Sequence, residues 1–243
     1  MLDDSEKMEP FADFNLDKLS SELIGYLRNE LDSKSVDYLE PLVRLTGGYE
    51  TIICRFQLSG VDERLSKPLI IRVYSQNSDY YQPLKESMLQ NAMADLGYPV
   101  PAVYFTCSDK TILGGAFVIM KYSEGETLLD SNTPFARIFD ILGNLHARLH
   151  NIDPEPIVRK ANEFGVDSRL LKFESMLMGF RTQVNLNFSW LNEAAEWLFE
   201  NRPNDSEFLS VCHDDFHPRN ILFKDGQVKS VLDWGAFLIG FEP

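Results

Sequence analysis

Near its end the chain reads HDDFHPRN, a stretch whose side chains could serve metal or phosphate chemistry. Asp215 lies five residues before Asn220, and another acid, Asp233, follows two apolar segments. Carboxylate and amide oxygens are the ligands that Mg²⁺ prefers, usually with substrate phosphates completing its coordination. His213 and His217 are four residues apart and raise zinc as an alternative metal. The third interpretation is an ordinary charged loop.

Two of the oxygen-bearing side chains are expected to meet at one end of a β-hairpin. An Asp-Gly pair at positions 225–226 separates two apolar segments and is a strong signal for a two-residue hairpin turn. A tight turn predicts that Asn220 faces Val231. Asp233 then lies on the same face as Asn220, as its diagonal neighbour with Cα atoms about 7–8 Å apart. Oxygen donors converging in this way favour Mg²⁺ over zinc.

The zinc interpretation depends on the two histidines sharing one face. His213 and His217 would do so on a helix, but Pro218 and the flanking strands argue against a helix there. We therefore expect His213 to be a packed, hydrogen-bonded loop residue. A metal-dependent hydrolase built on this His and Asp cluster remains as a third functional hypothesis.

The order H-x-D-x-x-x-x-N, followed by an Asp after a second strand, is also the layout of the protein-kinase catalytic loop. The chain resembles the aminoglycoside phosphotransferase and choline kinase family of kinase-like enzymes, whose loop commonly reads HGDxHPxN and whose second Asp sits in an I/L-D-W unit. HDDFHPRN and VLDW match both motifs, with a hairpin-length gap between them. The resemblance implies transfer of the γ-phosphate of ATP to a small-molecule hydroxyl. It makes Asp215 the catalytic base, and Asn220 and Asp233 the Mg²⁺ ligands.

The resemblance also implies nucleotide-binding residues in the first half of the chain. The segment VRLTGGYETIICRF corresponds to the first strand, glycine turn and second strand of the family, so Gly47 and Gly48 would approach the phosphates. Arg72 in LIIRVYS takes the place of the base that holds the nucleotide phosphates, and Glu86 fits the acid that pairs with it. The segment FVIMKYSEG resembles the hinge, where adenine would meet the backbone of Met120, Lys121 and Tyr122.

The chain departs from the family pattern at three places. Asp214 stands where the family usually has Gly, and Gly235 stands where relatives often have Glu. The chain also ends ten residues after Asp233, whereas relatives continue through several more helices. We therefore expect a C-terminal lobe that is incomplete, as in a truncated enzyme.

Hydrophobic periodicity predicts the elements that carry these residues. Apolar residues at helical spacing predict an amphipathic helix over 16–31. Two strands, a helix and two further strands are then predicted, over residues 49–58, 67–75, 80–97, 100–108 and 114–123. Beyond Gly125, helical patterns cover residues 135–149, 170–180 and 189–201. A strand-rich half followed by a helix-rich half indicates an α+β fold.

Together with the resemblance, this order predicts a protein-kinase-like fold of two lobes. The N-terminal lobe, residues 1–122, would hold an antiparallel sheet with one main helix and bind the nucleotide. The C-terminal lobe, residues 123–243, would be helical and carry the catalytic loop and the metal-binding hairpin. His146 and His150, in a helix that resembles a family helix ending in Leu-His, are expected to be structural.

Composition narrows the range of partners. The chain has 243 residues, 44% of them hydrophobic, which is enough for a substantial core. Its net charge of −14 disfavours a nucleic-acid partner and leans toward a cationic acceptor. Three widely spaced cysteines without a CxxC motif indicate a reducing compartment. With no signal-peptide pattern and no apolar run of membrane-spanning length, we expect a cytoplasmic protein without a membrane partner.

Besides the metal-dependent hydrolase, two functions from different classes are the main hypotheses. The first is a kinase that uses ATP and Mg²⁺, with an acceptor such as an aminoglycoside, macrolide, choline, homoserine or sugar-amine. The second is a nucleotide-binding, catalytically silent module that retains the fold and the metal ligands.

Overall fold

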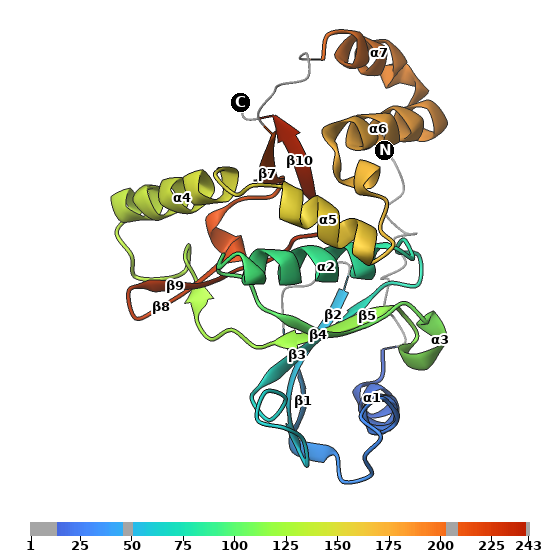
Figure 1. The fold of residues 1–243 in the computed structure, drawn as a ribbon, viewed down its shortest axis with the longest axis vertical. Coiled ribbons are helices and arrows are strands. Elements are labelled where there is room, and N and C mark those ends of the chain that lie inside the picture. Colours follow the sequence, from blue (N-terminus) through green and yellow to red (C-terminus); the bar gives the residue numbers. More distant parts are fainter. Residues whose placement is uncertain (1–13, 46–50, 203–208, 242–243) are drawn as a thin grey trace, which may run out of the picture. The chain divides into compact units, whose positions relative to one another are not determined.

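The computed structural model describes residues 14–45, 51–202 and 209–241, which Figure 1 shows as a ribbon. The chain divides into two compact units. Unit 1 comprises Met1–Ser87 and Pro101–Ser123, and unit 2 comprises Met88–Val100 and Glu124–Pro243. Helix α2 (Gln82–Asp95) contributes to both units, because the division falls after Ser87. Within the described residues, no helix combines the length and the apolar character that crossing a membrane requires.

Unit 1 is built on a five-stranded sheet in the order β1-β2-β3-β5-β4, with every neighbouring pair antiparallel. The strands are β1 (Asp37–Arg44), β2 (Thr51–Ser59), β3 (Leu69–Tyr74), β4 (Val103–Cys107) and β5 (Phe117–Lys121). The segments that form β2 and β3 are rich in β-branched and aromatic residues, which suit a half-buried pleated surface. The expected antiparallel N-terminal sheet is therefore confirmed.

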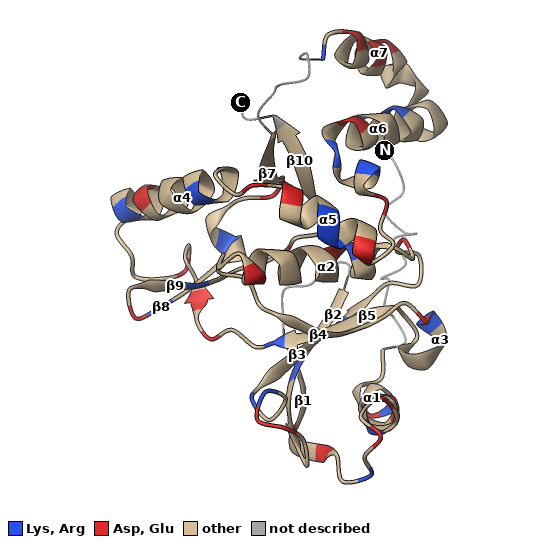
Figure 2. Ribbon diagram, in the orientation of Figure 1, with Lys and Arg blue, Asp and Glu red and all other residues tan. Residues whose placement is uncertain are grey.

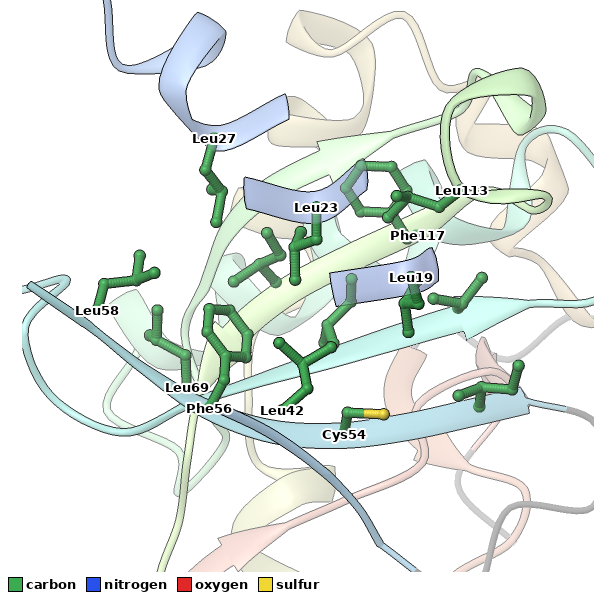
Figure 3. Packing of buried hydrophobic residues seen from close by; sticks show 14 of the residues in the cluster. Leu19, Leu23, Leu27, Leu42, Cys54, Phe56, Leu58, Leu69, Leu113 and Phe117 are labelled. Carbon is green, nitrogen blue, oxygen red and sulfur yellow. The ribbon is translucent and has the colours of Figure 1, made fainter. Parts of the chain in front are cut away.

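Helix α1 (Leu16–Glu30) packs on one face of this sheet. It begins at Asn15, whose side chain accepts a hydrogen bond from a backbone N–H of the first turn. Its buried stripe consists of Leu19, Leu23 and Leu27. Figure 3 shows this stripe beside Phe56 from β2 and Phe117 from β5, in one cluster of buried side chains. Burying one such side chain contributes about 1.5–3 kcal/mol, so this cluster is the main support of the sheet.

The alternation of side chains along β3 separates the core from the polar face of the sheet. Leu69, Ile71 and Val73 belong to the cluster beneath α1. The intervening residues, Ile70, Arg72 and Tyr74, therefore point to the opposite face. The alternation that buries Ile71 and Val73 beneath α1 therefore puts Arg72 on the other face of the sheet. The short helix α3 (Lys110–Leu113) adds Leu113 to the core cluster.

Unit 2 contains helices and two small sheets. Its further helices are α4 (Phe135–His150), α5 (Glu155–Glu163), α6 (Phe173–Asn187) and α7 (Asn192–Glu200), with short 3₁₀ turns η2 (Ser168–Leu171), η3 (Ser189–Leu191) and η4 (Pro218–Asn220). One sheet joins β6 (Glu126–Thr127), β8 (Ile221–Lys224) and β9 (Gln227–Val231), and the other pairs β7 (Leu209–His213) with β10 (Phe237–Phe241). The sequence predicts no element for α5 or β10.

The β8–β9 hairpin has the expected turn, but its register differs from the prediction. Lys224 pairs with Gln227 across the turn, as a tight turn requires. A register shift then occurs, so that Ile221 rather than Asn220 pairs with Val231. The cause is a β-bulge, in which β9 contains one more residue than the facing segment of β8. The prediction that Asn220 faces Val231 is therefore wrong by one residue.

Acidic residues are distributed widely over the described chain. In Figure 2, Asp and Glu positions occur on every one of the helices α1, α2, α4, α5, α6 and α7. The negative charge is therefore spread over several elements and does not by itself mark one acceptor surface.

The packing of α1 gives a direct stability prediction. We expect Leu23→Ala to lower the free energy of unfolding by about 2–5 kcal/mol, because it removes a fully buried side chain and leaves a cavity. Leu39→Ala in β1 is the matched control, since 61% of Leu39 is exposed; its cost should stay within about 0.5 kcal/mol. Urea denaturation measures both. Equal midpoints for the two variants would show that α1 is not part of the core of unit 1.

Candidate active site

Three polar residues predicted to carry chemistry lie in one connected segment of unit 2. Asp215 follows strand β7, Asn220 is the last residue of η4, and Asp233 comes shortly after β9. The sequence between them forms the β8–β9 hairpin, which brings its two ends together.

The backbone of Leu232 joins the two ends of this hairpin. Its N–H donates to the carbonyl oxygen of Asn220 at 2.7 Å. Its own carbonyl oxygen lies 2.9 Å from Nε2 of His213, at the end of β7. These bonds involve the residue directly before Asp233, so they bring Asp233 to the same end of the hairpin as Asn220. It is these bonds of Leu232, and not the diagonal pairing that the sequence predicts, that bring Asp233 to this end of the hairpin.

His213 fixes the loop from the other side. Its Nδ1 accepts the backbone N–H of Asp215 at 3.2 Å, so this nitrogen carries no hydrogen. Nε2 must then be the protonated nitrogen and donates to Leu232. Burial of the ring lowers the pKa of His213 against the opposing effect of nearby acids, which agrees with this neutral form. The expectation that His213 is packed and hydrogen-bonded is confirmed, but His213 is the last residue of strand β7 and not a loop residue.

Asp233 has an unusual backbone conformation. Its φ is +62°, in the left-handed region that non-glycine residues rarely occupy, although Asp tolerates it better than most. The residues on both sides hold it there. Leu232 makes the two backbone bonds described above, and the fully buried Trp234 donates its indole N–H to Val231 at 3.0 Å. Such a conformation, held by its surroundings, is found disproportionately at functional sites.

The carboxylate of Asp215 is open to solvent but is held by neighbouring side chains. Its side chain is 53% exposed. Nδ2 of Asn220 donates to Oδ2 of Asp215 and to its backbone oxygen, both at 3.0 Å. Because the amide nitrogen is turned toward Asp215, the amide oxygen of Asn220 lies on the other side of the group. The second carboxylate oxygen, Oδ1, lies 3.4 Å from Nε2 of His217.

Strand β10, which the sequence did not predict, supports the start of the loop. His213 pairs with Phe237 in the β7–β10 ladder, and the backbone N–H of Asp214 donates to Ala236 at 2.8 Å. The apolar run FLIGF is the signal that would have identified this strand. Beside the loop, His146 stacks on Phe216 with ring centroids 4.9 Å apart.

Unit 1 contains the other charged pair implied by the resemblance. Arg72 forms an ion pair with Glu86 of α2, with Nη1 and Oε2 3.2 Å apart. The buried Glu86 carboxylate also accepts the hydroxyl of Tyr74 at 2.7 Å and the amide of Gln82 at 3.0 Å. A buried carboxylate needs such donors, because an unpaired charge in the interior is costly. Arg72 is therefore held in place by the carboxylate of Glu86, which Tyr74 and Gln82 also bind.

The remaining predicted nucleotide residues are at the end of β5, and in the sequence just before β2. Gly47 and Gly48 are outside the described residues. Met120 is buried, while Lys121 and Tyr122 are more exposed. The backbone N–H of Lys121 donates to Ala102 at 2.9 Å, and that of Tyr122 donates to Pro68 at 3.1 Å. Both of these donors are thus already bonded within unit 1.

The donor set of unit 2 fits a hard cation better than a soft one. In the described part of the chain, no group of three or more His, Cys, Asp or Glu side chains is placed to hold a metal ion. Asn220 and Asp233 instead offer two side chains with oxygen donors at one end of a hairpin. Two protein ligands suit Mg²⁺, which usually retains waters and binds substrate phosphates as well.

Comparison with solved structures identifies the fold. A putative aminoglycoside phosphotransferase from Ralstonia eutropha superposes with a TM-score of 0.58 at 20% identity, covering 90% of this chain and 65% of that one. The streptomycin–ATP–APH(2")-IIa ternary complex gives a TM-score of 0.57 at 20% identity, covering 94% and 75%. APH(4)-Ia in complex with AMP-PNP and hygromycin B gives 0.56 at 17%, covering 91% and 73%. The protein-kinase-like fold is therefore confirmed.

Curated relatives place the same region inside longer proteins. Acyl-CoA dehydrogenase family member 11 from Homo sapiens is 24% identical over 164 residues, which cover 64% of this chain and 21% of the relative. The Gallus gallus protein of the same name is 25% identical over 175 residues, covering 69% and 22%. The chain thus spans about a fifth of the length of these relatives.

The sequence pattern of the phosphotransferase enzyme family matches residues 46–241. This range contains the Arg72–Glu86 pair, the loop after β7 and the hairpin that ends at Asp233. The chain belongs to the phosphotransferase enzyme family.

Proposed function

We propose that this protein is an ATP-dependent phosphotransferase that moves the γ-phosphate to a hydroxyl group of a small molecule. The observation that carries this proposal is the hydrogen bond between Asn220 and Asp215, together with the backbone bond from Leu232 to Asn220 that brings Asp233 to the same end of the hairpin, in a member of this family. Phosphoryl transfer needs little covalent chemistry from the protein. It depends mainly on positioning and on stabilising charge, for which a rigid cluster of this kind is suited.

Asp215 is the proposed catalytic base. Its exposed carboxylate is reachable by an acceptor hydroxyl, and it would orient that hydroxyl and take its proton during transfer. The bond from Asn220 to Oδ2 limits rotation of the carboxylate while leaving lone pairs available. Asn220 therefore orients the carboxylate of Asp215, and the backbone of Leu232 holds Asn220 in place.

Asn220 and Asp233 are the proposed Mg²⁺ ligands. The amide oxygen of Asn220 faces away from Asp215, which leaves it oriented for a cation, and Asp233 supplies a carboxylate. When bound, Mg²⁺ would neutralise negative charge on the nucleotide phosphates. The left-handed backbone of Asp233 and the bonds of Leu232 hold the two ligands at one end of the hairpin.

The proposed nucleotide-binding lobe is residues 1–122, which contain unit 1 except for Ser123 and also include residues 88–100 of unit 2. Arg72, held by Glu86, would balance phosphate charge, and the glycine turn with Gly47 and Gly48 would approach the phosphates. Met120, Lys121 and Tyr122 form the proposed adenine segment. Because two of their N–H groups are already bonded within unit 1, we expect carbonyl oxygens of this segment to take part in recognising adenine.

The acceptor is proposed only as a class, a small molecule with a hydroxyl group. Aminoglycoside-, choline- and homoserine-like compounds follow from the family resemblance, and the acidic composition favours a cation. Because the curated relatives are named acyl-CoA dehydrogenase family members, acyl-CoA compounds that carry a hydroxyl group are a further class to assay. An ADP-release assay over these classes would identify the acceptor.

A nucleotide-binding module without transferase activity is the alternative. Asp214 in place of the usual Gly puts a second carboxylate beside the proposed base, and this is the observation that favours the alternative. The two functions share nucleotide binding and differ in transfer. Two measurements therefore separate them.

The first measurement is Mg²⁺-dependent nucleotide binding. We expect a non-hydrolysable ATP analogue with Mg²⁺ to stabilise the protein by about 2.7 kcal/mol at a hundred times its Kd, because only the folded state binds it. Asp233→Asn should reduce the part of this stabilisation that depends on Mg²⁺. The matched control is Asp225→Asn, because Asp225 is in the hairpin turn and also has a positive φ. This control should leave the Mg²⁺-dependent stabilisation unchanged. Calorimetry showing no nucleotide binding to folded protein would exclude both functions.

The second measurement is phosphoryl transfer by Asp215→Asn. The substitution preserves size but removes the base, so kcat should fall by about 10²–10⁴-fold while nucleotide binding persists. Asp214→Asn removes a neighbouring exposed carboxylate and serves as the control, with turnover maintained. Turnover close to the wild-type rate in Asp215→Asn would remove Asp215 from the catalytic role. Nucleotide binding without transfer in the wild type would support the silent module.

A further inference from the structure

His217 contacts both Asp215 and Asn220, although the proposed chemistry assigns it no role. Its Nε2 lies 3.4 Å from Oδ1 of Asp215 and 3.5 Å from Nδ2 of Asn220. On the other side of the ring, Nδ1 accepts the backbone N–H of Arg219 at 3.2 Å. The imidazole thus lies between the 3₁₀ turn η4, which it caps, and the carboxylate of Asp215.

These contacts determine where the ring hydrogen must be. Nδ1 accepts a hydrogen bond from Arg219, so it carries no hydrogen, and the hydrogen of the ring is on Nε2. Two groups lie near Nε2. The Asn220 amide nitrogen is a donor and cannot accept this hydrogen, whereas the Asp215 carboxylate can. The N–H of His217 is therefore available only to Oδ1 of Asp215 among these two groups.

We propose that His217 is a positioning residue for phosphoryl transfer, whose Nε2–H orients the carboxylate of Asp215. The inference rests on the proposed function. Asn220 donates to Oδ2 and His217 faces Oδ1, so each carboxylate oxygen has one donor and keeps a lone pair for the acceptor hydroxyl. A base that is otherwise exposed is thereby restricted to one orientation, as catalytic geometry requires.

The distance of 3.4 Å exceeds the usual length of a charge-assisted hydrogen bond. Hydrogen bonds of catalytic groups are often long without substrate and shorten in the reacting complex. The proposal therefore places the effect of His217 on kcat rather than on nucleotide binding.

A purely structural role for His217 makes a different prediction. The cap on η4 uses Nδ1, whereas the contact with Asp215 uses Nε2, so substitutions can separate the two. In His217→Asn, the side-chain oxygen replaces Nδ1 as the cap, but the donor toward Asp215 is lost. In His217→Gln, the amide nitrogen replaces Nε2 as a donor, but the cap is lost. Arg219→Gln retains the capped N–H and is the control.

The kinetic experiment compares these variants with the wild type on the same acceptor. We expect His217→Asn to retain the wild-type melting temperature and nucleotide KM but to lose about 10–100-fold in kcat. His217→Gln should retain a larger share of kcat despite a lower melting temperature. The reverse order, with His217→Asn the more active variant, would show that His217 only caps η4 and would overturn the proposal.

A spectroscopic measurement tests the contact without any turnover. In protein labelled with ¹⁵N at histidine, the His217 resonances should report the Nε2–H form, and Asp215→Asn should shift the Nε2 signal. A hydrogen on Nδ1, or an Nε2 signal that ignores Asp215→Asn, would overturn the positioning role whatever the activity. The expected signals combined with no transfer to any acceptor would instead refute the proposed function.

Discussion

The candidate site depends on the backbone of one residue, Leu232, which is bonded in two directions. Its N–H binds the carbonyl of Asn220, and its carbonyl receives the Nε2–H of His213. Neither bond uses a side chain of Leu232, so many residue types would satisfy them at this position. The bonds nevertheless decide where Asp233 lies, because it is the next residue and its φ is held positive. A buried imidazole and a hairpin end are thus joined through a peptide unit. A buried donor or acceptor that loses its hydrogen-bond partner costs about 1–3 kcal/mol. Loop conformations that break either bond of Leu232 are therefore disfavoured.

The polar groups of unit 1 are held by a different physical arrangement. Glu86 is buried and receives three donors, from Arg72, Tyr74 and Gln82. A buried pair of this kind contributes little net stability, but removing one partner costs about 3–5 kcal/mol because the other charge remains in the interior. The pair therefore specifies the orientation of Arg72 more than it stabilises the sheet. The stability of unit 1 comes from the apolar cluster beneath α1, and the two faces of β3 serve these two purposes separately.

The sequence predicts the features that depend on a local pattern of side chains. It does not predict those that depend on backbone hydrogen bonds between distant residues. The stripe of Leu19, Leu23 and Leu27 defines α1, and the Asp-Gly pair defines the hairpin turn, because each acts within a few residues. The bulge in β9 has no comparable signature, so the pairing counted back from the turn fails from Leu222 onward, before Asn220 is reached. The bonds of Leu232 are invisible for the same reason. Helix α5 did have a signal, since Pro154 and Pro156 stand at its start and Ile157 and Ala161 form its buried face. Its shortness and flanking loop residues hid it.

The structure also bears on the departure at Asp214. A family position that is usually Gly can reflect a backbone conformation closed to other residues, and a substitution would then distort the loop. Asp214 is not among the described non-glycine residues with positive φ, and its N–H bonds to Ala236 of the segment leading into β10. The backbone there is ordinary, and the side chain is exposed. Asp214 therefore adds charge without displacing Asp215, whose N–H still binds His213. An exposed carboxylate interacts with its neighbour through a high effective dielectric, so its effect on the base is electrostatic, modest and reduced by salt. Asp214 therefore supports the silent module only through its charge, because the backbone hydrogen bond between Asp215 and His213 is retained.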